Sequence, residues 1–491
     1  MILGTYTLNR PTNKRFLKAL GGDRGLPLLK EEKRSIALVL TGTFLEYFDV
    51  MLYMHLAIIL TPRFFPSTDP KMASLLGAFA FCSAYIFRPL GSLVFGYLGD
   101  KKGRKAPIVI TSVLMGLATL SIGILPSYEA IGVTASICFL IARALQGFSS
   151  IGDSIAAKVF TAEVGEGAFC MDFLSMLPDF VMTLGSLAAL VISMICLSID
   201  PTNGWRWPFF IGFTVALFSA IIRSKTMESP VFVGVVEDLK QKTANQDAIK
   251  FSPLLEIHKK NYWYYFGIEI VPPVAWYFSL RICTDLLSSL GMGTTAVIQH
   301  NSLVCATYLV FIGSIGYLSM RVDAFKLLKG RYLAGILSLP LIALCLVFMK
   351  HNQSVIFVVQ LVVICAFNTP TPALARIINS FPVIGRCTSM GFAYAASHSL
   401  VYVFTAMGAA VLQNTFGLWG PGVLLLYAGG ISFYCAYRFK PMEDPDNPEG
   451  SIELDTPEST SPSEPPSDVV EYPVQYRKRP SKPIMKVPLE R

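Results

Sequence analysis

Residues 96–105 read GYLGDKKGRK and form a densely charged link between two long apolar runs. The first of these runs ends near Phe95 and the next begins near Ala106. Basic residues in a short link between membrane spans mark its cytoplasmic side. Asp100 and Arg104 are spaced i, i+4, so they can pair on one face of a short helical turn. The composition of the link alone also fits a solvated basic loop.

The chain as a whole is too apolar for a soluble protein. It has 491 residues, of which 53% are hydrophobic and 15% are charged, and its mean hydropathy is +0.52. A soluble domain could not hide this much apolar surface from water. Each span needs about 20 mostly apolar residues, so the chain has room for roughly a dozen helices. The sequence therefore predicts an all-α integral membrane protein.

The apolar runs and their links predict twelve transmembrane helices with both termini cytoplasmic. Basic or charged links fall on one side of the membrane, and links poor in Lys and Arg fall on the other. The link at 161–167 is an exception, because it should be cytoplasmic and yet is acidic. The expected spans are 36–60, 72–98, 106–125, 133–157, 172–198, 207–223, 263–283, 295–318, 332–349, 354–376, 388–412 and 418–438.

The longest internal polar stretch lies near the midpoint and divides the spans into two sets of six. Gly316-Tyr317-Leu318 repeats Gly96-Tyr97-Leu98 after 220 residues, again at the end of the second run of its half. This spacing predicts duplicated halves, the second with Met320 in place of Asp100. The expected domains are a basic N-terminal segment (1–35), a six-helix bundle (36–223), a central linker (224–261), a second six-helix bundle (262–439) and a disordered tail (440–491).

Several classes of function are disfavoured by what the sequence lacks. The net charge is +8, but the basic residues lie beside apolar runs, which does not suggest nucleic-acid binding. The ten cysteines are scattered, without C-x-x-C or metal-ligand spacing, so no metal or other cofactor is expected. No P-loop, zinc-protease motif or serine nucleophile with placed partners stands out, so we expect neither an ATP-driven pump nor an enzyme.

Two acids lie near the middle of the first span. An ionisable side chain there costs at least a few kcal/mol and needs a partner or a water-filled cavity. Glu46 and Asp49 are spaced i, i+3 and share a face, with Tyr53 one turn further along. Two carboxylates one turn apart destabilise each other's ionised forms, which favours protonation of one of them. Glu46 and Asp49 are therefore the expected proton-coupling residues.

The fourth span is also too polar to face lipid. It carries Arg143, Gln146 and Asp153, which with Tyr53 are the expected substrate-binding residues. At about 1.5 Å rise per residue, Arg143 and Asp49 lie within roughly a turn of each other in depth, so an ion pair is geometrically allowed. Two interpretations stay open: a buried ion pair that fixes packing, or an arginine that binds an anionic substrate group.

Other polar residues within spans receive structural interpretations. Lys158 is expected to extend to the inner membrane interface, and Arg88, with Pro89, to shape a bend or anchor a loop. The remaining polar groups of this kind are Asp172, Asp179, Glu269, Arg281, His300 and His398.

Several motifs resemble a known family. Residues 96–105 are similar to the G-x-L-x-D-[RK]-x-G-R-[RK] signature of the major facilitator superfamily. Further matches are GTFLEYFD at 42–49, FRPLG at 87–91, QGFS at 146–149 and GWRWPFF at 204–210. Together they resemble the metabolite:proton symporters, which include proline/betaine, 2-oxoglutarate, citrate and shikimate permeases.

The resemblance implies alternating access between two six-helix bundles around a central cavity that Glu46, Asp49 and Arg143 would face. It implies a cytoplasmic gating loop of Gly96, Asp100, Gly103 and Arg104, in which Asp100 and Arg104 act as a latch.

The resemblance implies a proton-coupled symporter of a small organic carboxylate or zwitterion, and the buried charges supply its candidate residues. We expect it to be monomeric, in a bacterial inner membrane, with the solute, protons and the lipid bilayer as its partners. Two alternatives stay open: a membrane sensor that does not transport, and an exchanger without proton coupling.

Overall fold

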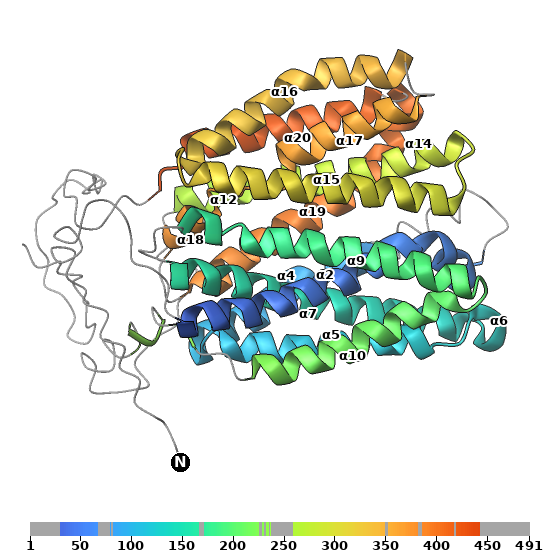
Figure 1. The fold of residues 1–491 in the computed structure, drawn as a ribbon, viewed down its shortest axis with the longest axis horizontal. Coiled ribbons are helices and arrows are strands. Elements are labelled where there is room, and N and C mark those ends of the chain that lie inside the picture. The colour runs from blue at the N-terminus through green and yellow to red at the C-terminus, as the bar shows by residue number, and fades with distance from the viewer. Residues whose placement is uncertain are drawn as a thin grey trace, which may run out of the picture. The chain divides into compact units, whose positions relative to one another are not determined.

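The computed structural model describes residues 30–66, 79, 82–165, 171–224, 228–229, 232–234, 236, 259–348, 352–381, 385–416 and 419–441. All regular secondary structure in these ranges is helical (Figure 1). Both chain termini, most of the expected central linker and the expected tail beyond residue 441 lie outside the described residues.

The helices of the first half are long and apolar, and prolines stand in the first turns of several of them. A proline is tolerated there because the first N–H groups of a helix have no intrahelical partner. The positive φ of Gly103, 95°, ends one helix directly after its last residue. The elements are α2 (Lys30–Phe64), α4 (Arg88–Lys102), α5 (Lys105–Ile124), α6 (Tyr128–Ile131), α7 (Val133–Gly165), α8 (Met171–Leu174), α9 (Leu177–Ile199), η1 (Gly204–Arg206) and α10 (Trp207–Arg223).

Two expected spans of the second half are interrupted. A turn at Glu269 and Ile270 precedes Pro272 and Pro273, and the segment from Asn368 to Ala373 is not helical. The prediction of a continuous helix over 354–376 is therefore wrong. The elements are α12 (Lys259–Ile268), α13 (Val271–Tyr277), the π-helical η3 (Phe278–Ile282), α14 (Cys283–Ser289), α15 (Thr294–Ser319), α16 (Ala324–Phe348), α17 (Gln353–Phe367), α18 (Leu374–Asn379), α19 (Arg386–Phe416) and α20 (Trp419–Arg438).

Seven helical stretches among the described residues are long and apolar enough to cross a membrane. Helix also occurs within each of the twelve expected ranges, but several of these helices are short or broken. The count of twelve spans and the side on which the termini lie stay predictions. The seven stretches are Lys30–Tyr53, Lys105–Ile124, Val133–Val164, Met171–Ile199, Gly204–Arg223, Thr295–Ser319 and Ala324–Phe348.

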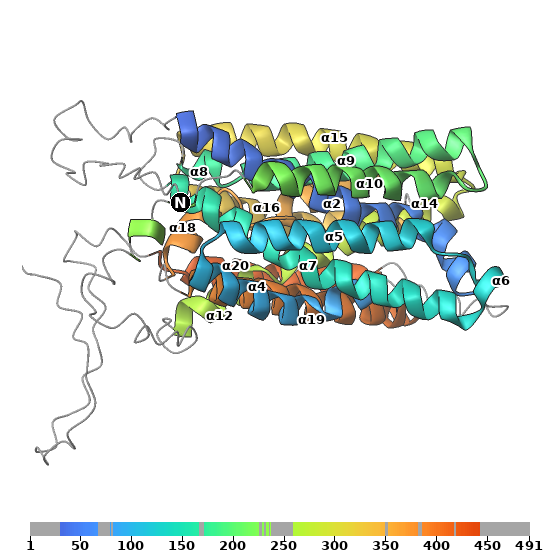
Figure 2. The ribbon, with the colours of Figure 1, turned by 90° about the horizontal axis from the view of Figure 1, so that it is seen from below.

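The helices before and after the central linker pack against each other, and the described residues belong to one compact unit. The main contacts between the two halves join α4 to α19 and α9 to α15 (Figure 2). This close packing does not separate two bundles, so the expected domain boundaries stay predictions.

Glycines allow both of these helix pairs to approach closely. A Cβ on Gly96 would lie 2.7 Å from Cα of Thr388 in α19, and a Cβ on Gly316 would lie 2.1 Å from the Met176 side chain, next to α9. The two glycines of the sequence repeat therefore occupy equivalent places, each at a contact between the halves. This equivalence supports the predicted duplication.

Candidate functional site

A cavity of about 70 Å³ lies between the helices of the two halves. Its walls come from α2, the helical stretch at 82–86, α4, α7 and α9 on one side, and from α12 to α13, the end of α17 and α19 on the other. Charged side chains of both signs and several aromatic rings share this space. It is lined by Tyr47, Met51, Tyr85, Arg88, Lys158, Asp179, Met182, Thr183, Ser186, Glu269, Pro272, Trp276, Asn368, Thr369, Pro370, Tyr394, His398 and Tyr402.

Apart from Arg88, the charged side chains of this central cavity each have a polar partner. Nζ of Lys158 lies 3.6 Å from Oδ1 of Asp179, and Nε2 of His398 lies 3.1 Å from Oε2 of Glu269. The expectation that Lys158 extends to the membrane interface is wrong, because its side chain is buried in the cavity wall.

Arg88 is the exception among these charges. Its side chain is 5% exposed, and its guanidinium lies 4.4 Å from the Tyr85 ring centroid. Within the described ranges it forms no ion pair, and its Nε has no hydrogen-bond partner. A buried cation without a counter-ion is costly, so an anionic group that entered the cavity would be held strongly. Arg88 therefore lines the site and does not merely shape the start of α4.

Aromatic rings surround these charges. The Tyr394 ring lies 4.0 Å from that of His398 and 4.7 Å from Nζ of Lys158, and the Tyr85 and Tyr402 rings are 4.1 Å apart. The faces of aromatic rings attract cations and shield apolar groups from water. The cavity thus suits a small solute with an apolar body, an anionic end and a cationic end.

The predicted residues Asp49 and Arg143 belong to a separate hydrogen-bonded chain inside the first half. Arg143 donates to Oε1 of Gln146 over 2.8 Å, Gln146 donates to Thr119 over 2.9 Å, and Thr119 donates to Oδ2 of Asp49 over 3.0 Å. The guanidinium of Arg143 also stacks 3.9 Å from the ring centroid of Tyr53. The direct ion pair that helical depth allowed is not formed, because Gln146 and Thr119 lie between its partners.

Asp49 is a buried acid with a single donor. It is 1% exposed, and its Oδ1 has no hydrogen-bond partner. No basic side chain lies within ion-pair distance of it in the described part of the chain. An unpaired carboxylate in such a place is stable only when protonated or when water reaches it.

Glu46 and Asp153 lie beside a second, smaller cavity of about 10 Å³ that Asp49 also lines. Ser154 donates to both carboxylate oxygens of Glu46, over 2.6 and 2.8 Å. Asp153 forms a buried ion pair of 2.6 Å with Arg223, whose guanidinium also donates to the carbonyl of Val39. Asp153 is therefore engaged inside the first half and does not line the central cavity.

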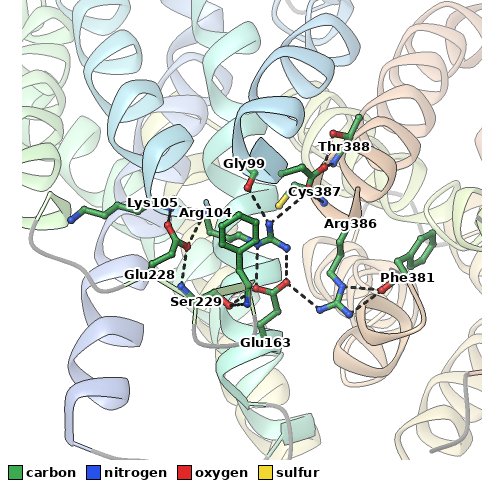
Figure 3. Close-up of polar contacts among 12 residues, drawn as sticks. Gly99, Arg104, Lys105, Glu163, Glu228, Ser229, Phe381, Arg386, Cys387 and Thr388 are labelled. Carbon is green, nitrogen blue, oxygen red and sulfur yellow. Dashed lines mark hydrogen bonds and ion pairs between the residues drawn. The ribbon is translucent and has the colours of Figure 1, made fainter. Parts of the chain in front are cut away.

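The charged link at 96–105 contacts the second half directly, as Figure 3 shows. The Asp100 carboxylate accepts the backbone N–H of Cys387 and of Thr388, over 3.1 and 2.9 Å, and the Thr388 hydroxyl over 2.6 Å. These donors open α19, where free N–H groups and the helix dipole favour an anion. The expected pairing of Asp100 with Arg104 is present, at 3.6 Å.

Glu163 joins this cluster and accounts for the acidic link at 161–167. Its carboxylate oxygen Oε1 lies 2.7 Å from Nη2 of Arg104 and 3.1 Å from Nη1 of Arg386, which belongs to α19. We call Asp100, Arg104, Glu163, Arg386 and Thr388 the first latch. Gly96 and Gly103 allow the close approach and the turn that place it.

The structure thus separates residues that the sequence grouped together. Glu46, Asp49, Tyr53, Arg143, Gln146 and Asp153 lie within the first half, outside the central cavity. Arg88, Lys158, Asp179, Glu269 and His398 stand out in the sequence as costly polar groups, but nothing in the sequence places them around one cavity. Thr119 and Arg223 do not stand out, because a threonine and an arginine at the end of a span carry no distinctive signal.

Comparisons with known proteins agree with this architecture. Residues 35–254 match the family model described as sugar (and other) transporter. The chain is 30% identical over 345 residues to the proline/betaine transporter of Salmonella typhimurium, covering 64% of this chain and 69% of that protein. It is 30% identical over 344 residues to a putative proline/betaine transporter of Staphylococcus aureus, covering 69% and 72%.

Solved structures with a similar fold are much more distant in sequence. The proton:xylose symporter XylE bound to 6-bromo-6-deoxy-D-glucose superposes with a TM-score of 0.70 at 15% identity, over 83% of this chain and 95% of that one. The human organic anion transporter MFSD10 superposes with a TM-score of 0.60 at 14% identity, over 84% and 100%.

Proposed function

This chain belongs to the metabolite:proton symporter family of the major facilitator superfamily, and we propose that it imports a small zwitterionic solute, such as proline or glycine betaine, together with protons. It is an integral membrane protein of a transporter family. Twelve spans, cytoplasmic termini, a bacterial inner membrane and a monomeric state form part of the proposal.

The observation that carries the choice of solute is Arg88, which forms no ion pair with any described residue and lines a cavity that also holds Glu269. Arg88 offers a cation to a solute carboxylate. Glu269 and the surrounding aromatic rings offer a place for an ammonium or quaternary ammonium group. A dicarboxylate or tricarboxylate would instead bring several negative charges beside Asp179 and Glu269, which repel them.

The buried acids of the first half support proton coupling. Asp49 has one hydroxyl donor, an unpartnered oxygen and no counter-ion among the described residues. Its chain of hydrogen bonds leads through Thr119 and Gln146 to Arg143. A proton that binds or leaves Asp49 changes the charge at one end of this chain and so alters how α2, α5 and α7 pack. We assign Asp49 as the principal proton site and Glu46 as a second one.

Uptake of labelled solutes into vesicles tests this proposal. Purified protein in vesicles with an imposed pH gradient should accumulate proline or glycine betaine, whereas citrate and 2-oxoglutarate should enter more slowly. Arg88→Gln should raise KM about tenfold or more, the size expected from losing a charge-assisted hydrogen bond. Asp285→Asn, at an exposed acid on α14 whose side chain is 55% exposed, is the matched control and should behave as wild type.

Three outcomes would contradict the proposal. Accumulation that survives collapse of the pH gradient would indicate an exchanger without proton coupling. A preference for citrate would contradict the zwitterion assignment. Absence of uptake for every solute in the screen would favour the sensor alternative, which removal of residues 441–491 would then test.

A further inference from the structure

The interruption between α17 and α18 is held in a defined shape. Arg331, on α16, donates through its three guanidinium nitrogens to the carbonyls of Ala366, Thr369 and Thr371. These carbonyls have lost the helical partners that a continuous helix would give them, and an unsatisfied carbonyl is costly inside a membrane. Arg331 therefore positions the residues of this segment that line the central cavity, among them Thr369.

This segment and α18 contact α8 and α9 of the first half at three successive points. The Thr369 hydroxyl donates to Oδ2 of Asp179. The Ser175 hydroxyl donates to the carbonyl of Pro372 over 3.1 Å. The Arg376 guanidinium binds both carboxylate oxygens of Asp172, over 3.1 and 2.6 Å.

These contacts form an antiparallel ladder between the halves. Its partners are spaced 0, 3 and 7 residues along 369–376 and 0, 4 and 7 along 179–172, so the two segments run past each other in opposite directions. The ladder runs from the cavity, which Asp179 and Thr369 line, toward the link between α15 and α16, where Arg376 also binds Asp323 over 2.5 Å. We call Asp172, Arg376 and Asp323 the second latch.

Asp179 connects the ladder to the binding site, because the same carboxylate faces Lys158 across 3.6 Å. Resting on the proposed function, we propose that the ladder is a second closure between the halves and that Asp179 is its release point. A solute carboxylate that is held by Arg88 and also pairs with Lys158 draws the Lys158 cation away from Asp179. The buried Asp179 then keeps a single hydroxyl donor, and such a carboxylate favours a state in which water reaches it. When the ladder opens, water reaches Asp179.

The native thiol of Cys387 offers a readout that does not depend on transport. Cys387 is 2% exposed, and its backbone N–H is bound to Asp100 in the first latch, so separation of the halves at this end exposes it. Its rate of labelling by a water-soluble maleimide can be followed by peptide mass spectrometry in the full-length protein. Cys283, 1% exposed in the core of the second half, should stay unlabelled in every folded variant.

Without solute, breaking the ladder should speed the labelling of Cys387. We expect Thr369→Val and Arg376→Gln to raise this rate about tenfold, because each removes a charge-assisted hydrogen bond. Thr369→Ser keeps the hydroxyl and should label at the wild-type rate. Asp285→Asn, outside both latches, is the control for the loss of an ion pair. Wild-type rates in Thr369→Val and Arg376→Gln, with Cys283 still protected, would overturn the proposal.

The release step is tested by comparing Cys387 labelling in the wild type and in Lys158→Gln, each with and without glycine betaine. Glycine betaine should speed labelling of Cys387 in the wild type. Lys158→Gln should label fast already without solute and should not respond to it. Slow labelling of Lys158→Gln would show that Asp179 does not release the ladder. Failure of the wild type to bind glycine betaine would contradict the proposed function alone, because the comparisons without solute still decide whether the ladder closes this end.

Discussion

At the scale of single residues, the buried charges of the first half differ in whether they have a counter-ion. Asp153 has Arg223 at 2.6 Å, whereas Asp49 has, among the residues that the structure describes, only the hydroxyl of Thr119. A buried ion pair with further hydrogen bonds is a fixed structural unit, and removal of one partner leaves an uncompensated charge. A lone buried acid can instead gain or lose a proton without breaking such a unit. The two acids therefore have different roles although both lie beside the same small cavity.

Replacement of Asp49 tests the role of the lone acid. Asp49→Asn should abolish uphill accumulation of solute driven by a pH gradient and leave solute exchange between the two sides of the vesicle intact. The amide keeps the hydrogen bond from Thr119 but cannot release a proton. Proton-driven accumulation that persists in Asp49→Asn and also in Glu46→Gln would show that neither acid couples transport to protons.

Replacement of Asp153 tests the paired acid. Asp153→Asn leaves the Arg223 guanidinium, which is 0% exposed, without its carboxylate and should destabilise the protein by about 3–5 kcal/mol. Thermal unfolding in detergent measures this loss. The double variant Asp153→Asn with Arg223→Met should recover part of it. If Asp153→Asn has wild-type stability but a raised KM, Asp153 contributes to substrate binding, as the sequence predicts.

At the scale of elements, glycine decides where helices of the two halves touch. Gly96 brings α4 against the first turn of α19, where Asp100 accepts its three donors. A Cβ at position 96 would lie 2.7 Å from a backbone atom, which cannot rotate away as a side chain can. The geometry of the first latch thus depends on a residue that contributes no charge to it.

A small side chain at this glycine should be costly. Gly96→Ala should destabilise the closed arrangement by about 1–3 kcal/mol, the usual range for overpacking, and should speed labelling of Cys387. Gly313→Ala is the matched control, because a Cβ there meets nothing within 4 Å on the same kind of helix. Equal labelling rates in the two variants would contradict this account.

The elements also show what could be predicted from the sequence and what could not. Apolar length and basic links located the helices, because membrane thickness and charge act along the chain. The interruption at 368–373 was missed, although Pro370 and Pro372 lie within it. Prolines also occur inside helices, as Pro340 does in α16, so a proline alone does not predict an interruption. The interruption depends on the hydrogen bonds from Arg331 to backbone carbonyls, which join residues that are distant in sequence.

The same limit applies to the site. The rule that buried charges are costly identified Arg88, Lys158 and Glu269, but it could not say which of them face one another. Lys158 lies near the end of its expected span, where extension to the membrane interface is the common outcome. Its contact with Asp179 depends on the packing of α7 against α9, which no local pattern encodes.

At the scale of the whole molecule, two latches join the halves, and their charges are inverted. In the first latch the acid Glu163 lies between two arginines, and in the second the arginine Arg376 lies between two aspartates. The repeat at Gly316 is therefore degenerate at Met320 but keeps an acid nearby, at Asp323.

The contributions of the two copies of the repeat to the transport rate can be compared by mutation. Asp100→Asn weakens three hydrogen bonds at the start of α19 and should lower the transport rate about tenfold or more. Met320→Ala should change the rate by less than about twofold, because position 320 is partly exposed and carries no charge. Equal effects of the two changes would show that the first latch is not based on charge.

Within the second latch, the ion pair of Asp323 with Arg376 should be insensitive to pH in the physiological range. Burial raises the pKa of Asp323, but the Lys326 backbone N–H and Arg376 lower it more, so the folded pKa lies below the ordinary value. Its stabilising effect is present above the unfolded pKa of about 3.9 and is lost only as pH falls through the lower folded pKa. Asp323→Asn should therefore lower transport by the same factor throughout the range from about pH 5 to pH 8. A factor that changes within this range would contradict the assignment.

The carboxylate contacts between the halves have a direction, although the Ser175 hydroxyl donates the opposite way, to the carbonyl of Pro372. Asp100, Glu163, Asp172 and Asp179 all belong to the first half, and each accepts hydrogen bonds from donors of the second half. Two copies of the first half placed face to face would set acid against acid. Two copies of the second half would set Arg376 and Arg386 against other donors. Each half therefore complements the opposite half and repels a copy of itself, which directs the two halves to pair with each other as the protein folds.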